Sequence, residues 1–317
     1  MTLPAHPPAY VPLVQLVRDG MVEGVHHGSV VVHAPDGGLR WSLGDATTPI
    51  YPRSAAKPLQ AVALLRAGLD LPADQLALAG ASHSGEAIHL ATAEAILAGL
   101  DADLLGNPAD LPYDPIEHDA WVAAGRGPSR LAHNCSGKHA AMLRACRLNG
   151  WPVEGYLSPD HPLQRLVAEV VTELSGEKPA HVAADGCGAP LFALSLSGLA
   201  RAIARIATAP AGTPEHTVAS AYRSHPELVA GNRRDTTALM RVVPGLLAKD
   251  GFEGVQVLAL PDGTTAAIKI ADGSDRARHA ATLAVLRRLG VDPVALAGVR
   301  QVGVPDSLTL RPVDALA

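Results

Sequence analysis

The amino-acid sequence predicts an α+β domain whose sheet is assembled from segments far apart in the chain. Of the 317 residues, the valine-rich stretch 13–33 and the stretch 252–270 have the alternation and turn residues of β-strands. The segments between them have the apolar spacing of helices. Strands toward both ends with helices between them are typical of an α+β domain. No repeat, low-complexity linker or clear boundary divides residues 1–317, so we expect a single domain.

The first elements follow from local signals. Residues 13–33 alternate like two or three antiparallel strands, with Gly28 as punctuation, and the turn Asp36-Gly37-Gly38 follows. The first predicted helix covers residues 54–66. Ser54 is its candidate N-cap, and Gly68 follows its end.

The middle of the chain is predicted to be helical and its last quarter to return to strands. Further helices are expected at 91–100, 137–148, 162–174 and 191–207. A strand over 252–260 is followed by the turn Pro261-Asp262-Gly263 and a second strand over 266–270. A helix over 276–289 closes the pattern.

Composition and charge exclude several classes of protein. The chain is 48% hydrophobic, and 26 basic against 31 acidic side chains leave a formal net charge of -5. This balance provides no basic surface for a nucleic acid, and no apolar run approaches the roughly 20 residues that span a bilayer. The N-terminus lacks a signal-peptide layout, and three cysteines fit a reducing compartment better than a disulfide framework. We therefore expect a soluble, cytoplasmic protein.

Lysine is scarce, which draws attention to the lysines that remain. Only 5 of the 26 basic residues are lysines, namely Lys57, Lys138, Lys178, Lys249 and Lys269. A buried lysine can lose its proton whereas an arginine effectively cannot, so each is a candidate for chemistry. The alternative is that some are ordinary surface residues.

Ser54 and Lys57 form the first candidate site. A serine at a helix start exposes its hydroxyl beside free backbone N–H groups, and a lysine three residues later returns to the same face. A partly desolvated amine there can take the serine proton and create a nucleophile. The S-x-x-K pattern recurs at Ser175 and Lys178 in a polar loop, and we interpret that match as coincidence.

Further segments hold candidate residues. Ser82 lies in the loop 80–86, which could approach a ligand or simply cap the next helix. Cys135 and Cys187 lie in polar loops and, if they face each other, could bind zinc together with lysine or histidine, but buried inert thiols are the alternative that spacing alone favours. Lys249-Asp250-Gly251 has the outline of the K-T-G strand-edge motif of penicillin-recognising serine enzymes, with Asp in place of Thr. Lys269, within an apolar run, is the rival of Lys249.

Together these segments resemble the bacterial L-asparaginase II family, the Rhizobium etli-type (class 3) asparaginases. The resemblance extends over nearly the whole chain, through Arg53-Ser54-x-x-Lys57-Pro58, Ala81-Ser82-His83-Ser84-Gly85-Glu86, His133-Asn134-Cys135-Ser136-Gly137-Lys138-His139, Asp185-Gly186-Cys187-Gly188, His225-Pro226-Glu227-Leu228, Lys249-Asp250-Gly251-x-Glu253-Gly254 and Lys269-Ile270-x-Asp272-Gly273. It implies a fold similar to serine β-lactamases and glutaminases, an antiparallel sheet with helices on both faces. It also implies a homodimer that hydrolyses L-asparagine to L-aspartate and ammonia.

The resemblance also implies roles for individual residues. Ser54 would be the nucleophile and Lys57 its base, and Ser82 with Lys249 would form a second pair that relays protons to the leaving ammonia. One zinc ion would be held by Cys135, Lys138 and Cys187, and would orient substrate. Arg53, His139 and Asp185 are expected near the substrate, whose carboxylate needs a cation.

Three alternatives remain open at this point. A β-lactamase or peptidase of the same fold would share Ser54 and Lys57 without requiring the two cysteine loops. A glutaminase would share the chemistry and differ in pocket depth. A zinc-stabilised amino-acid-binding protein would need neither a nucleophile nor its base, so the Ser54–Lys57 pair favours an enzyme.

Overall fold

A computed structural model describes residues 6, 8–299 and 307–317 of the chain. Its main sheet has the strand order β11-β1-β2-β10-β9-β8, with β3 paired to β2, and every pairing is antiparallel. The bounds are β1 (Val11–Arg18), β2 (Met21–His33), β3 (Leu39–Leu43), β8 (Leu247–Gly251), β9 (Val255–Ala259), β10 (Thr265–Ile270) and β11 (Leu308–Pro312). β2 pairs with β10 so that Val30 stands opposite Ile268. The sheet therefore joins the two ends of the chain, as the sequence predicts.

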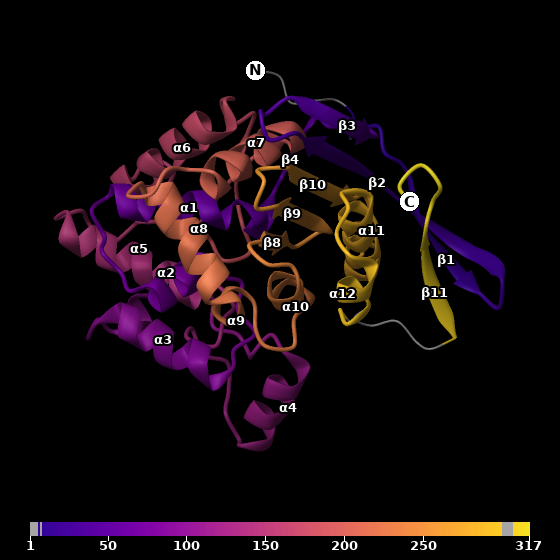
Figure 1. The fold of residues 1–317 in the computed structure, drawn as a ribbon. Coiled ribbons are helices and arrows are strands. Elements are labelled where there is room, and N and C mark those ends of the chain that lie inside the picture. Colours follow the sequence, from indigo (N-terminus) through magenta and orange to yellow (C-terminus); the bar gives the residue numbers. More distant parts are fainter. Residues whose placement is uncertain (1–5, 7, 300–306) are drawn as a thin grey trace.

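Helices cover both faces of this sheet. Every residue of β9 and β10 is buried, although alternate side chains point to opposite faces. Helix α7 (Leu196–Ala207) packs against β2, β9 and β10, and α11 (Asp275–Arg288) packs against β1, β9, β10 and β11 (Figure 1). The expected α+β class, an antiparallel sheet flanked by helices on both faces, is confirmed.

A second group of helices gathers beyond β8, on the left in Figure 1. Helix α1 (Lys57–Arg66) lies among α5, α6, α7 and α8, which is why most of its residues are buried. The bounds of the other helices are α2 (Ala73–Ala79), α3 (Ala87–Leu97), α4 (Pro115–Ala123), α5 (Ser136–Leu148), α6 (Pro162–Ser175), α8 (Pro214–Ser224), α9 (Pro226–Val229), α10 (Asp235–Val242) and α12 (Pro293–Ala297), with 3-10 turns η1 (Arg53–Ala56) and η2 (Ala102–Leu104). Small two-stranded pairs are formed by β4 (Pro49–Ile50) with β7 (Leu194–Ser195) and by β5 (Val182–Ala184) with β6 (Pro190–Phe192).

The junction between the sheet and this helical group is unusually close. The turn η1 packs against β8, at the edge of the sheet. A Cβ at Gly251 would lie 2.6 Å from the carbonyl oxygen of Pro52 and 2.9 Å from the amide nitrogen of Ala55. Only glycine fits there without displacing backbone, so Gly251 allows β8 to approach η1.

Two local predictions are wrong. Ser54 does not cap a helix: it lies inside η1, and α1 begins only at Lys57 with Ala56 as its N-cap. The predicted helix 191–207 begins instead at Leu196, because the hydroxyl of Ser195 accepts a hydrogen bond from the amide of Gly198 and so caps it. The residues before it form β6 and β7.

The remaining predicted helices are found within a few residues of their expected bounds, as α3, α5, α6 and α11. Helices α2, α4, α8, α9, α10 and α12 and strand β11 are not anticipated by the sequence analysis. Lys249 lies in β8, a strand of its own, rather than just before a strand at 252–260.

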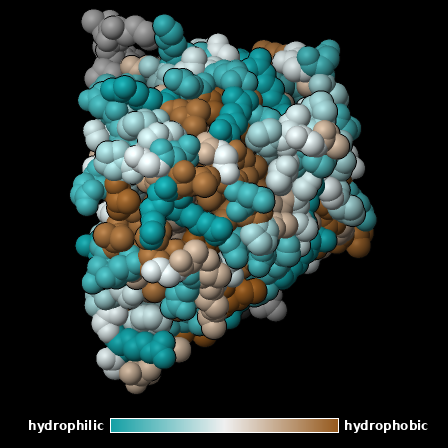
Figure 2. Space-filling model, turned by 90° about the vertical axis from the view of Figure 1, so that its left-hand side faces the viewer, coloured by the Kyte–Doolittle hydropathy of each residue, from teal (hydrophilic) through white to brown (hydrophobic). Residues whose placement is uncertain are grey.

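The helical side of the molecule has a mixed surface. Figure 2 shows apolar patches lying between hydrophilic ones on the face that is turned to the left in Figure 1. Ile88 of α3 and Leu148 of α5 are among the exposed apolar side chains. Among the described residues, no helix is both long and apolar enough to span a membrane.

Candidate active site

A polar cavity of about 310 Å³ lies where β8 meets η1. Ser54 of η1, Ser82 of the loop before α3 and Gly251 of β8 line it, together with Asn134, Arg234 and Asp250. The structure thus brings Ser54 and Ser82, which belong to two separate motifs of the sequence, to one cavity. The alternative role of Ser82 as a helix cap is not realised, because Glu86 caps α3 through a reciprocal pair of hydrogen bonds with His89.

Ser54 stands on a strained piece of backbone. The preceding residue, Arg53, has a φ of +50°, a left-handed conformation that non-glycine residues rarely adopt. Such strain persists only where surrounding contacts hold it, and it concentrates at functional sites. Here Arg53 is held by its Nε, which lies 2.8 Å from Oδ1 of Asp185. The result is a buried serine whose side chain reaches the cavity.

Lys57 contacts two other candidate residues, Ser82 and Cys135. Its buried Nζ donates to the carbonyl oxygen of Ala81, lies 3.0 Å from Oγ of Ser82 and lies 3.0 Å from Sγ of Cys135. Ser54 and Lys57 also line one small cavity together. Lys57 is therefore hydrogen-bonded to the second serine rather than to the first.

Lys249 is fully buried in β8, and its Nζ donates to the backbone oxygen of Asp250 and, at 2.8 Å, to its carboxylate. Burial lowers the pKa of Lys249 to about 8, the nearby charge of Lys57 adds to this effect, and Asp250 opposes it. No hydrogen bond joins Lys249 to Ser82 among the described residues, so the expected second serine–lysine pair is not formed by direct contact. The rival Lys269 donates to the backbone oxygens of Glu253 and Ile270 and lines a different cavity.

The two predicted cysteine loops meet. Cys135 and Cys187 are buried in one small cluster, and Nζ of Lys138 lies 3.1 Å from Sγ of Cys187. A hydrogen bond from the thiol of Cys135 and the charge of Lys138 outweigh burial and hold the pKa of Cys187 well below its usual range. The cluster therefore brings two cysteine sulfurs and the amine of Lys138 together.

Within the described residues, no group of three or more His, Cys, Asp or Glu side chains is arranged to hold a metal. The amine of Lys138, whose Nζ lies 3.1 Å from Sγ of Cys187, is the further nitrogen donor at these cysteines. The donor set fits zinc in its chemistry, because thiolates and a nitrogen are ligands that zinc accepts.

The residues expected near the substrate lie around the cavity rather than in its lining. Arg53 is bound to Asp185, and both line a neighbouring cavity. His139 is fully buried in α5, where its Nδ1 lies 2.7 Å from the hydroxyl of Tyr156.

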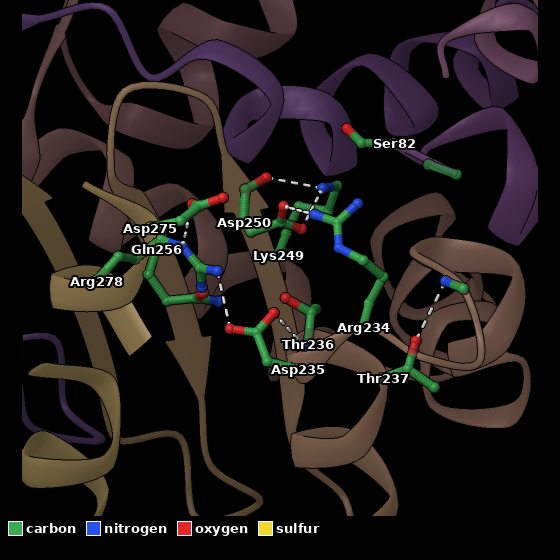
Figure 3. A network of polar contacts seen from close by, with 12 residues as sticks. Ser82, Arg234, Asp235, Thr236, Thr237, Lys249, Asp250, Gln256, Asp275 and Arg278 are labelled. Carbon is green, nitrogen blue, oxygen red and sulfur yellow. Dashed lines mark hydrogen bonds and ion pairs between the residues drawn. The ribbon is translucent and has the colours of Figure 1, made fainter. Parts of the chain in front are cut away.

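A network of charged side chains extends from the cavity into the protein (Figure 3). Arg234 Nη2 lies 2.7 Å from Oδ2 of Asp250, and Arg278 Nη2 lies 2.8 Å from Oδ2 of Asp235. Burial alone would raise the pKa of both carboxyl groups. At Asp250 the charges of Lys249 and Arg234 outweigh this effect of burial, and the pKa of the carboxyl group lies far below its usual range. At Asp235 the charge of Arg278 does the same. The network is therefore a fixed set of buried charges.

Several residues of this site escaped the sequence analysis. Arg234, Tyr113 and Asp275 line the cavity but belong to no predicted motif. The one local signal is the run Arg233-Arg234-Asp235 just before a helix, and such a run is as easily read as ordinary surface charge.

Fold and site together define the class of this protein: an α+β domain with a polar cavity that contains two serines and is bordered by buried lysines. The chain belongs to the L-asparaginase II family, whose family model matches residues 14–307. It is therefore an amidohydrolase that acts on a small-molecule amide. No curated protein matches the sequence.

Similar solved structures include three that differ in name. Mglu in its native form is 16% identical with a TM-score of 0.46, over 85% of this chain and 67% of that chain. A β-lactamase from Mycobacterium bovis is 15% identical with a TM-score of 0.46, over 82% and 94% of the two chains. A probable glutaminase from Bacillus subtilis, complexed with 6-diazo-5-oxo-L-norleucine, is 13% identical with a TM-score of 0.35, over 83% and 78%.

Proposed function

We propose that this protein hydrolyses the side-chain amide of L-asparagine to L-aspartate and ammonia, through an acyl-enzyme on Ser54. Membership in the L-asparaginase II family supports the reaction. The observation that carries the mechanism is the hydrogen bond of 3.0 Å between Lys57 Nζ and Ser82 Oγ, at a cavity that Ser54 also lines.

The first step forms the bond between Ser54 Oγ and the amide carbon. Lys57, in its deprotonated form, takes the hydroxyl proton of Ser54, and backbone N–H groups including that of Ser54 stabilise the oxyanion. The bond between carbon and nitrogen then breaks. Because the hydroxyl of Ser82 is bonded to Lys57, it can pass a proton from Lys57 to the nitrogen, which leaves as ammonia.

The second step returns the enzyme to its starting state. Lys57 takes a proton from water, the hydroxide attacks the ester carbon, and the proton returns to Ser54 Oγ as aspartate leaves. Lys249 is held by Asp250 beside the cavity. When its buried amine is protonated, its positive charge acts electrostatically on the groups of this relay.

We also propose that a zinc ion binds at Cys135, Lys138 and Cys187, with Asp185 nearby, and that the protein belongs to the Rhizobium etli-type subclass. The ion would supply a fixed positive charge that orients the substrate. We further propose a cytoplasmic homodimer. The three cysteines are free and buried thiols, which suits a reducing compartment, and light scattering of the purified protein tests the dimer.

The decisive experiment measures ammonia release from L-asparagine and L-glutamine by the wild type, Ser54→Ala and the control Ser175→Ala. The control changes the serine of the second S-x-x-K match, which lies at the end of α6. Release from L-asparagine by the wild type and Ser175→Ala but not by Ser54→Ala supports the proposal. Full activity in Ser54→Ala refutes the nucleophile, and a preference for L-glutamine favours a glutaminase.

A further inference from the structure

Arg234 is the cationic residue among the described residues that line the cavity of Ser54 and Ser82. It directly precedes α10, and its Nη2 is bonded to Asp250. Its Cζ lies 4.7 Å from the ring centroid of Tyr113, so the guanidinium is held between a carboxylate and an aromatic face. In Figure 3 this guanidinium points away from the start of α10, toward Lys249, Asp250 and the side on which Ser82 lies.

The hydrogen-bond donors of the Arg234 guanidinium are only partly used. Nη1 of Arg234 is buried and has no hydrogen-bond partner among the described residues. A buried donor without a partner costs free energy, and an acceptor group of a ligand in the cavity would recover it. A carboxylate is the group whose geometry matches the fork of an arginine.

The other charges of the cavity are acidic. Asp250 is already neutralised by Lys249 and Arg234, whereas Glu253 and Asp275 are more exposed carboxylates of the same lining. Among the described residues of the lining, one cation with an unused donor and two accessible anions match a zwitterion. This combination is complementary to a free α-amino acid, which carries a carboxylate and an ammonium on one carbon.

We propose that Arg234 binds the α-carboxylate of the substrate, so that the enzyme accepts a free amino acid and discriminates against asparagine whose α-carboxyl group is amidated or in a peptide bond. This inference rests on the proposed function, whose substrate class it defines. Arg53 and His139, which the sequence suggested for this role, do not line this cavity: Arg53 is bound to Asp185, and His139 is enclosed beside Tyr156.

The test compares Arg234→Gln with Arg233→Gln on two substrates, L-asparagine and L-asparaginamide, in which the carboxylate is replaced by a neutral amide. Arg233 is the matched control because it is the neighbouring arginine but is paired with Asp114 and Glu117 and does not line the cavity. For Arg234→Gln, kcat/KM for L-asparagine is expected to fall about 100-fold, as for the loss of a buried charge-assisted hydrogen bond. Its kcat/KM for L-asparaginamide, with L-aspartic acid α-amide as the product, should change by less than about threefold.

Arg234→Lys serves as the second variant. It keeps the charge but not the fork, and it should show a raised KM for L-asparagine alone even if Arg234→Gln does not fold. An equal loss on both substrates, or unchanged activity on L-asparagine, would overturn the assignment of Arg234.

Failure of the proposed function can be recognised separately. If the wild type releases ammonia from neither substrate, the amidase proposal fails, and calorimetric titration then decides the role of Arg234. Binding of L-aspartate in preference to its α-amide by the wild type, lost in Arg234→Gln, supports the carboxylate site. No such preference in the wild type refutes it.

Discussion

Nζ of Lys57 lies 3.0 Å from the hydroxyl oxygen of Ser82, and the same nitrogen lies 3.0 Å from the sulfur of Cys135. Lys57 thus connects the serine site with the cysteine cluster. Because Lys57 is almost completely buried, its hydrogen bonds are not shared with bulk water. A change at this position should therefore affect the chemistry directly.

Lys57→Met should lower the rate of ammonia release by about 10³-fold, because it removes the general base while preserving an unbranched apolar stem. Lys178→Met is the matched control: it changes the lysine of the second S-x-x-K match, which is exposed, and should retain wild-type activity. Steady-state kinetics with L-asparagine measure both. More than a tenth of wild-type activity in a folded Lys57→Met would contradict its role as the base.

The stability of the wild type should rise with pH between about 8 and 10.5 because of Lys249. Burial lowers the pKa of this lysine to about 8 from the ordinary value of 10.5, so in this range the unfolded chain binds a proton that the folded chain does not. Below pH 8 the folded protein carries the full cost of the buried charge, and this cost disappears as the pH rises. Lys249→Met should lack this increment.

Urea unfolding of the wild type, Lys249→Met and Lys178→Met at pH 7.5 and pH 10 measures the effect. The free energy of unfolding of the wild type should gain on the order of 2 kcal/mol relative to Lys249→Met over this range. Lys178→Met should follow the wild type. Parallel pH profiles for the wild type and Lys249→Met would show that burial does not perturb Lys249.

Metal binding should depend on two of the three cysteines. Cys135→Ser with Cys187→Ser should abolish co-purified zinc, measured by plasma mass spectrometry, because both changes replace sulfur ligands. Cys146→Ser is the control, since Cys146 is a buried thiol of the main hydrophobic core. Equal zinc content in the double variant and the wild type would refute the site.

Asp235→Asn should destabilise the protein by about 3–5 kcal/mol, because it leaves the buried Arg278 without its buried carboxylate partner. Asp119→Asn, at a carboxylate whose side chain is 85% exposed, should have almost no effect. Chemical denaturation measures both. A loss below about 1 kcal/mol in Asp235→Asn would mean that Gln256 and Asp275 suffice to compensate Arg278.

Much of the fold and part of the candidate site can be predicted from short stretches of sequence. The alternation in 13–33 and 252–270 predicts strands that do pair, as β2 and β10. The three-residue spacing of Ser54 and Lys57 brings both to one small cavity. The strand prediction succeeds because the period of a strand relates near neighbours in the chain, and the spacing of Ser54 and Lys57 is likewise a local property.

Local reasoning failed where a distant contact decides the conformation. The start of α7 is displaced because residues 190–195 are drawn into strand pairs with β5 and β4. Ser54 falls in a 3-10 turn that packs against β8, a strand almost 200 residues away in the sequence. Neither partner is visible in the sequence around the segment concerned.

By itself, the sequence determined the α+β class, the family resemblance, and the identity of the serines, lysines and cysteines that could carry chemistry. Only the tertiary structure decided the partners of these residues: Lys57 bonds Ser82, Lys249 bonds Asp250, and Arg234 lines the cavity with an Nη1 that has no partner in the part of the chain that the structure describes. The physical reason is that burial and hydrogen bonding between groups far apart in sequence depend on how whole elements pack. The spacing of residues within one element does not encode that packing.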